Sequence, residues 1–80
     1  MDHAAILTRL TDLFREIFDD DRLVLTSDTA AADVPGWDSM NHITIVVEAE
    51  RRFGVKFRTG EIEELHNVGE FITLIEQKTS

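Results

Sequence analysis

Hydrophobic side chains recur at helical spacing in three stretches of the chain. Residues 4–18 repeat them at positions i, i+3, i+4 and i+7, the pattern of an amphipathic helix, and Asp2 stands where an N-cap is expected. The apolar positions of this predicted helix are Ile6, Leu7, Leu10, Leu13, Phe14, Ile17 and Phe18. Residues 67–78 predict another such helix, capped by Asn67, with an apolar face formed by Val68, Phe71, Ile72 and Ile75.

Residues 39–53 predict a further helix, although the β-branched side chains of residues 43–47 favour a strand. The length of the segment, a cap at Asp38 or Ser39, and Gly54 as a common helix-ending residue outweigh that preference. Residues 55–58 alternate as an extended segment, and residues 59–65 add a short helix. We therefore expect an all-α fold, a four-helix bundle with three main helices, a short third helix and a long first loop, in a single domain over residues 1–80.

The long first loop covers residues 19–37, which have no helical period and are punctuated by Asp, Ser, Thr and Pro. Loops of this length in a small domain are usually functional or packed on themselves. We expect Leu23, Val24 and Leu25 to tuck under the helices. The acidic run 19–21 does not fit a calcium-binding EF-hand loop, because position six falls on Val24 and position twelve on Ala30.

The charge balance is strongly acidic, with sixteen Asp and Glu against eight Lys and Arg among 80 residues. Binding to nucleic acid depends on neutralising phosphates with basic side chains, so it is disfavoured. An acidic surface attracts basic protein partners, or it serves solubility alone.

Cysteine is absent, so disulfides and thiolate metal sites are excluded and a reducing cytoplasm is compatible. His3, His42 and His66 do not have the spacing of metal ligands, and we predict no metal site. No stretch approaches the roughly 20 apolar residues of a membrane span, and the N-terminus lacks the pattern of a secretory signal. The expected location is the cytoplasm.

The segment VPGWDSMNHI, residues 34–43, places Ser39 where the loop gives way to a helix, and three hypotheses compete for this serine. It caps the helix, which is the simplest. As an enzyme nucleophile it lacks the G-x-S-x-G elbow; His42 is three residues away, but nothing points to an orienting group or to oxyanion donors. As a covalent attachment site it has an advantage, because the N–H groups and partial positive charge of a helix N-terminus suit a phosphate ester.

Three short motifs follow one another along the chain: Asp38-Ser39-Met40, then Phe53-Gly54, then Asn67-Val68. With these motifs and its helix layout, nearly the whole chain resembles the acyl carrier protein family. The resemblance implies that Ser39 carries 4′-phosphopantetheine, transferred from coenzyme A by a magnesium-dependent phosphopantetheinyl transferase, with Asp38 supporting that enzyme and its metal. The thiol of the arm would hold acyl groups as thioesters for acyl-loading and acyl-processing enzymes.

The chain would be a carrier, not a catalyst, and we expect a monomer. An aminoacyl or peptidyl carrier uses the same arm, and a helical interaction module without an arm is the alternative from another class.

The helix over residues 39–53 divides into three arcs when 100° is allotted to each residue. The polar arc holds Asn41, Thr44, Glu48, Arg51 and Arg52, and the core arc holds His42, Ile45, Val46, Ala49 and Phe53. A second apolar arc holds Met40, Ile43 and Val47. We expect Met40 and Val47 to form an exposed strip that contacts partners, with Glu48, Arg51 and Glu61 completing the surface; burial under the first loop is the alternative.

Two aromatic residues near Ser39 have structural interpretations. His42 is expected to be a half-buried packing residue, and Trp37 is expected to anchor the loop against the helices.

The helix after Ser39 departs from the fatty acid branch of the family, in which acidic residues usually run down this helix. Here Asn41 and Thr44 come early and Arg51 and Arg52 come late. The acidic docking patch is thus thinner, and a specialised lipid, polyketide-type or aminoacyl pathway is expected.

Overall fold

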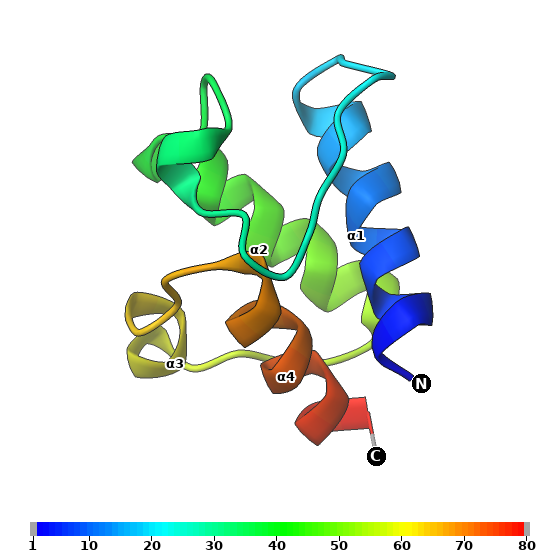
Figure 1. Cartoon of the computed structure of the whole chain (residues 1–80). Coiled ribbons are helices and arrows are strands. Elements are labelled where there is room, and N and C mark those ends of the chain that lie inside the picture. The colour runs from blue at the N-terminus through cyan, green and yellow to red at the C-terminus, as the bar shows by residue number, and fades with distance from the viewer. Residues whose placement is uncertain (1, 80) are drawn as a thin grey trace.

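The computed structural model describes residues 2–79, and all regular structure in that range is helical. The elements are α1 (His3–Ile17), the single 3₁₀ turn η1 (Ala31–Asp33), α2 (Ser39–Phe53), the short α3 (Thr59–Glu63) and α4 (Val68–Thr79) (Figure 1). The predicted four-helix fold is confirmed. The turn η1 was not predicted, because three residues carry no periodicity.

Polar side chains fix where the helices begin, and a glycine fixes where α2 ends. Asp2 accepts a hydrogen bond from the N–H of Ala5 at 2.8 Å, which confirms it as the N-cap of α1. Of the two candidate caps for α2, Asp38 is the one used. Gly54 follows α2 with a φ of 66°, in the left-handed region that glycine enters without steric cost.

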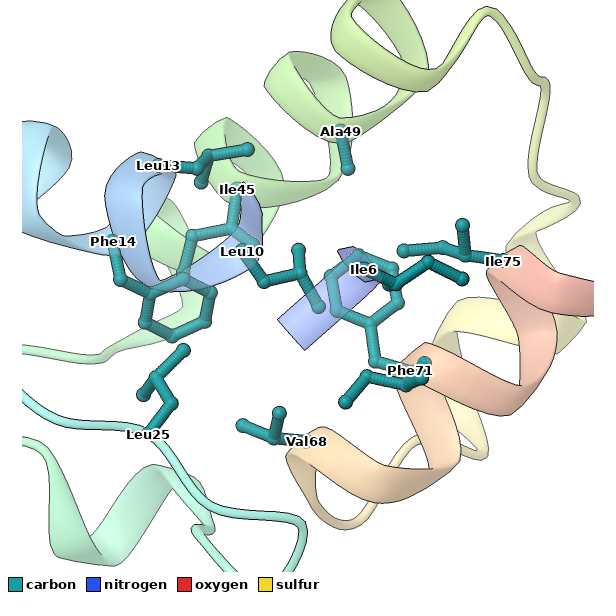
Figure 2. Packing of buried hydrophobic residues seen from close by; sticks show 11 residues of the cluster. Ile6, Leu10, Leu13, Phe14, Leu25, Ile45, Ala49, Val68, Phe71 and Ile75 are labelled. Carbon is teal, nitrogen blue, oxygen red and sulfur yellow. The ribbon is translucent and has the colours of Figure 1, made fainter. Parts of the chain in front are cut away.

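The core forms where α1, α2 and α4 meet, and one residue of the first loop joins it. Figure 2 shows side chains from these elements pointing toward one another. The buried cluster is Ile6, Leu10, Leu13, Phe14, Leu25, Ile45, Ala49, Val68, Phe71, Ile72 and Ile75. The apolar face predicted for α4 is confirmed, because all four of its residues are buried.

The first loop packs in part, and the expectation for it is partly wrong. Leu25 is buried and Leu23 is half-buried against the core, but Val24 is 71% exposed. Neighbouring side chains of an extended backbone point in opposite directions, so a segment that turns Leu23 and Leu25 inward turns Val24 outward. The acidic run 19–21 is exposed, as expected for a solvated helix end.

The same loop supplies acceptors for the first two N–H groups of α4. Figure 1 shows the chain after α1 descending to the start of α4. The carbonyl of Thr29 accepts from the N–H of Val68 at 2.8 Å, and the carbonyl of Ser27 accepts from the N–H of Gly69 at 2.9 Å. The side chain of Asn67 accepts from the N–H of Glu70, which confirms Asn67 as the N-cap.

Gly69 is required by this close approach. A Cβ atom on Gly69 would stand 2.9 Å from the Ser27 carbonyl oxygen, whereas a Cβ on Gly60 in α3 would meet nothing within 4 Å. We expect Gly69→Ala to destabilise the protein by about 1–3 kcal/mol, because the loop must shift and lose its bonds to α4. Gly60→Ala, the matched control, should not lower the melting temperature. Thermal unfolding followed by circular dichroism measures both; equal stability of the two variants would contradict this account.

Candidate functional site

Ser39 is the first residue of α2 and is exposed. Asp38, just before it, accepts a hydrogen bond from the N–H of Asn41 through Oδ1 at 2.9 Å. The side-chain amide of Asn41 in turn donates to the carbonyl of Gly36. The loop and the helix are thus joined on both sides of Ser39, so its hydroxyl is held at a defined place.

The start of α2 differs from the start of α4 in its free backbone groups. The first N–H groups of a helix have no acceptor within the helix. At α4 the first two are bonded to loop carbonyls, as described above. At α2 these two groups belong to Ser39 and Met40, and no backbone carbonyl within residues 2–79 is bonded to them. Such groups, with the partial positive charge of the helix end, favour an anion.

Trp37 and His42 form an aromatic pair next to Ser39. The indole N–H of Trp37 donates to Nδ1 of His42 at 3.3 Å, and the two rings lie nearly parallel, 22° apart. Trp37 also meets Phe14 of the core edge-on, with ring centroids 5.1 Å apart. Both expectations are confirmed, since Trp37 anchors the loop and His42 is a half-buried packing residue.

Two hollows have this pair in their walls. An open groove of about 760 Å³ runs between the start of α2 and α3, and its walls include Trp37, Ser39, His42, Ile43 and Ile62. A smaller cavity of about 70 Å³ shares Ala31, Trp37 and His42 with the groove, and its other walls include Leu65, His66 and Phe71. Ser39 lines the groove and not the smaller cavity.

The outward face of α2 carries the predicted apolar strip. Met40 is 79% exposed and Val47 is 55% exposed, and Ile43 between them is 63% exposed. The alternative that the first loop covers them is therefore wrong. We call these three residues the α2 strip.

Glu48, Arg51 and Arg52 of α2 pair with one another and with α1. Arg51 donates to Glu48 at 2.7 Å, and Arg52 pairs with Glu16 of α1 at 2.6 Å. The hydrogen bond from Arg51 holds the pKa of Glu48 below its usual value, and the bond to Glu16 raises the pKa of Arg52. Arg52 thus links two helices, whereas Arg51 remains mostly exposed at the end of the strip.

Glu61 is also held within the protein. Its carboxylate accepts the N–H of Arg58 at 2.8 Å and pairs with Lys78 of α4 at 3.0 Å, and these two contacts lower its pKa. Contact of Glu61 with partners stays a prediction, and it would compete with these bonds.

The nucleophile hypothesis finds no support at Ser39. His42 would have to accept the serine proton as the base, but its Nδ1 already accepts the Trp37 N–H, which in the neutral ring leaves the proton on Nε2. A serine, a histidine and a carboxylate do meet elsewhere: Ser27 Oγ lies 3.0 Å from His3 Nε2, and His3 Nδ1 lies 3.4 Å from Glu76. This chain of contacts ties α1, the loop and α4 together. Among residues 2–79 no cluster of three potential metal ligands occurs, and no helix is long and apolar enough to cross a membrane.

A family model described as the phosphopantetheine attachment site matches residues 8–75. The chain belongs to the acyl carrier protein family. Its cofactor is 4′-phosphopantetheine, attached covalently, and its general function is to carry that group. The start of α2 fits such a group, because its first two N–H groups can bind a phosphate and an exposed hydroxyl stands beside them.

Two relatives agree with this assignment. The solution structure of a holo acyl carrier protein from Geobacter metallireducens superposes with a TM-score of 0.85, is 43% identical, and covers 90% of this chain and 83% of that one. An acyl carrier protein from Thermotoga maritima is 27% identical over 73 residues, which are 91% of this chain and 90% of that protein.

Some features of the carrier's site were not found from the sequence. Asn41 was placed on a polar arc, but it clamps the loop to α2. The hydrogen bond between Trp37 and His42 was also missed, although a donor and an acceptor five residues apart at a loop–helix junction are a usable signal. Ser39, Asp38 and Met40 lie together at the start of α2, whereas Glu61 lies on α3.

Because Asp38 is the cap, substitutions of the two neighbouring residues should differ. We expect Asp38→Ala to lower the free energy of unfolding by about 1 kcal/mol, since the N–H of Asn41 loses its acceptor. Ser39→Ala should change it by less than about 0.5 kcal/mol. Urea unfolding of the unmodified proteins measures both values. A larger loss for Ser39→Ala than for Asp38→Ala would mean that the serine is primarily structural.

Proposed function

We propose that Ser39 is the attachment site of the arm and that this carrier presents acyl thioesters to partner enzymes. The observation that carries the proposal is the difference between two helix starts. The loop closes the N–H groups of α4, but it leaves those of α2 open beside an exposed serine. A phosphodiester on Ser39 would accept hydrogen bonds from the free N–H groups of α2, whereas the corresponding groups of α4 already donate to loop carbonyls.

The transfer itself needs a separate phosphopantetheinyl transferase. The hydroxyl oxygen of Ser39 forms the new bond to the phosphorus of the phosphopantetheinyl group, loses its proton, and displaces the nucleotide part of coenzyme A. Asp38 keeps Oδ1 for the cap, and its Oδ2 has no hydrogen-bond partner among the described residues. That oxygen is the one available to the transferase and its magnesium ion.

The pathway we propose is a specialised lipid or polyketide-type pathway. α2 has no acidic residue in its first turn and two arginines in its last. A partner that recognises this helix therefore cannot rely on a run of carboxylates next to Ser39. Apolar contact along the α2 strip (Met40, Ile43, Val47), followed by a charged contact at the Glu48–Arg51 pair, is the arrangement that the exposed face offers.

Modification of Ser39 can be tested by intact-mass spectrometry. Incubation with coenzyme A, magnesium and a broad-specificity phosphopantetheinyl transferase should add the mass of one arm to the wild type. Ser39→Ala should remain unmodified, and Ser27→Ala is the matched control that should still be modified. Addition to Ser39→Ala would place the arm elsewhere. An unmodified wild type would favour an interaction module without an arm.

The α2 strip can be tested with the transferase as the partner. We expect Met40→Ala and Val47→Ala each to reduce kcat/KM for arm transfer about five- to tenfold, the loss typical of a central apolar contact. Val24→Ala is the matched control, because the exposure of Val24 on the loop lies between those of Met40 and Val47 and Val24 lies outside the strip. Continuous assays of coenzyme A consumption give the ratio. Equal rates for all three variants would remove the strip from this interface.

A further inference from the structure

We infer that Asn41 is a positioning residue for transfer of the arm, because its side-chain bond to the carbonyl of Gly36 holds Ser39 in the form that the transferase modifies. The inference rests on the proposed attachment at Ser39. Its starting point is that Asn41 bridges Ser39 twice, each time to a residue that precedes the serine. The backbone N–H of Asn41 donates to Asp38 Oδ1 at 2.9 Å, and its side-chain amide donates to the Gly36 carbonyl.

The turn before Ser39 leaves one carbonyl free for this bond. The chain enters the site through a turn that begins at Val34, whose carbonyl accepts the N–H of Trp37 at 3.1 Å. Pro35 follows at the second position, and Gly36 at the third has a φ of 88°, which fits a type II turn. Such a turn uses the carbonyl of its first residue and not that of its third. The free carbonyl of Gly36 accepts from Asn41 instead.

Few bonds connect this turn to α2. Among residues 2–79, two side-chain hydrogen bonds cross from the turn to the helix: the Asn41 amide to Gly36, and the longer bond from Trp37 to His42, at 3.3 Å. Glycine has more backbone freedom than any other residue, so without the Asn41 bond the chain can rotate at Gly36. That rotation would move the segment that leads directly into Ser39.

The chemistry of this clamp requires a donor at position 41. The partner is a carbonyl, so an ionised aspartate of the same shape could not replace the amide, and an alanine offers no polar group. The amide also adds no charge. The first turn of α2 contains no acidic residue, so no carboxylate there opposes the attraction between the helix N-terminus and a phosphate group.

Loss of the clamp should raise the KM of the carrier and leave kcat unchanged. One neutral hydrogen bond shifts an equilibrium about two- to tenfold. A carrier that is clamped for only a fraction of the time binds the transferase more weakly by that fraction. The constant kcat is measured on bound carrier, in which the transferase itself holds the junction.

The test uses the unmodified carrier, coenzyme A, magnesium and a broad-specificity phosphopantetheinyl transferase, well below the unfolding temperature of every variant. Asn41→Ala should raise the KM for the carrier about two- to tenfold, with kcat within about twofold of the wild type. Thr44→Ala is the matched control, because the Thr44 hydroxyl donates to the carbonyl of Met40 within α2 and does not join the helix to the loop. It should change neither constant.

Amide relaxation measured by nuclear magnetic resonance, without the transferase, separates positioning from direct contact with the enzyme. In Asn41→Ala the order parameters of Asp38 and Ser39 should fall from about 0.85, typical of rigid backbone, toward about 0.6. They should not fall in Thr44→Ala. The amide of Leu10, which is buried in the core, is the internal reference and should be unchanged in both variants.

Equal KM values for Asn41→Ala and the wild type would overturn the inference and leave the proposed function intact. A raised KM with unchanged order parameters would also overturn it, because Asn41 would then contact the transferase instead of positioning Ser39. A fall in kcat alone would do the same. Failure of the wild type to accept any arm would overturn the proposed function, and the inference with it.

Discussion

The free backbone N–H groups at the start of a helix must find acceptors, and this protein meets that requirement in two different ways. At α4 the first loop brings the carbonyls of Ser27 and Thr29 to the helix, and Asn67 supplies the rest. The loop can do so because Leu25 is buried and fixes its path. At α2, the one side chain among residues 2–79 that accepts from the first N–H groups is Asp38, which takes the third N–H group. The same loop thus closes one helix start and leaves the other open, and it is the open one that bears an exposed serine.

The open helix start stays in place because it is anchored on both sides. Gly36, with a φ of 88°, turns the chain so that its carbonyl accepts from Asn41. Trp37 reaches the core at Phe14 and reaches α2 at His42. A substituent at Ser39 would therefore project from a junction that hydrogen bonds hold on both sides. An exposed residue at a fixed junction suits a group that must be presented to partner enzymes, because the attachment point is already ordered and loses little conformational entropy on binding.

Much of the fold could be predicted because helical periodicity is a local property. The faces of α1 and α4, the caps Asp2 and Asn67 and the stop at Gly54 all follow from spacing within one segment. Ser39 is different, because spacing alone accounts for it as a helix cap, and it was predicted as the attachment site only from motifs that recur in one family. The exposure of Val24 was missed, because composition does not say which side of an extended segment faces the core. The pairing of Arg52 with Glu16 was missed too, since it joins helices that are far apart in the sequence.

The helix α2 combines three roles that depend on its rotation about its own axis. Ile45, Val46 and Ala49 face the core and fix the rotation, and Arg52 reinforces it by pairing with Glu16. With the rotation fixed, Met40, Ile43 and Val47 face outward, and His42 meets Trp37 of the loop. A turn of the helix about its axis would move His42 away from Trp37 and bury part of the strip at the same time. Packing of the core, the contact between His42 and Trp37 and exposure of the strip are therefore not independent features. One rotational setting of α2 specifies all three, and the setting is determined by apolar residues that no partner touches.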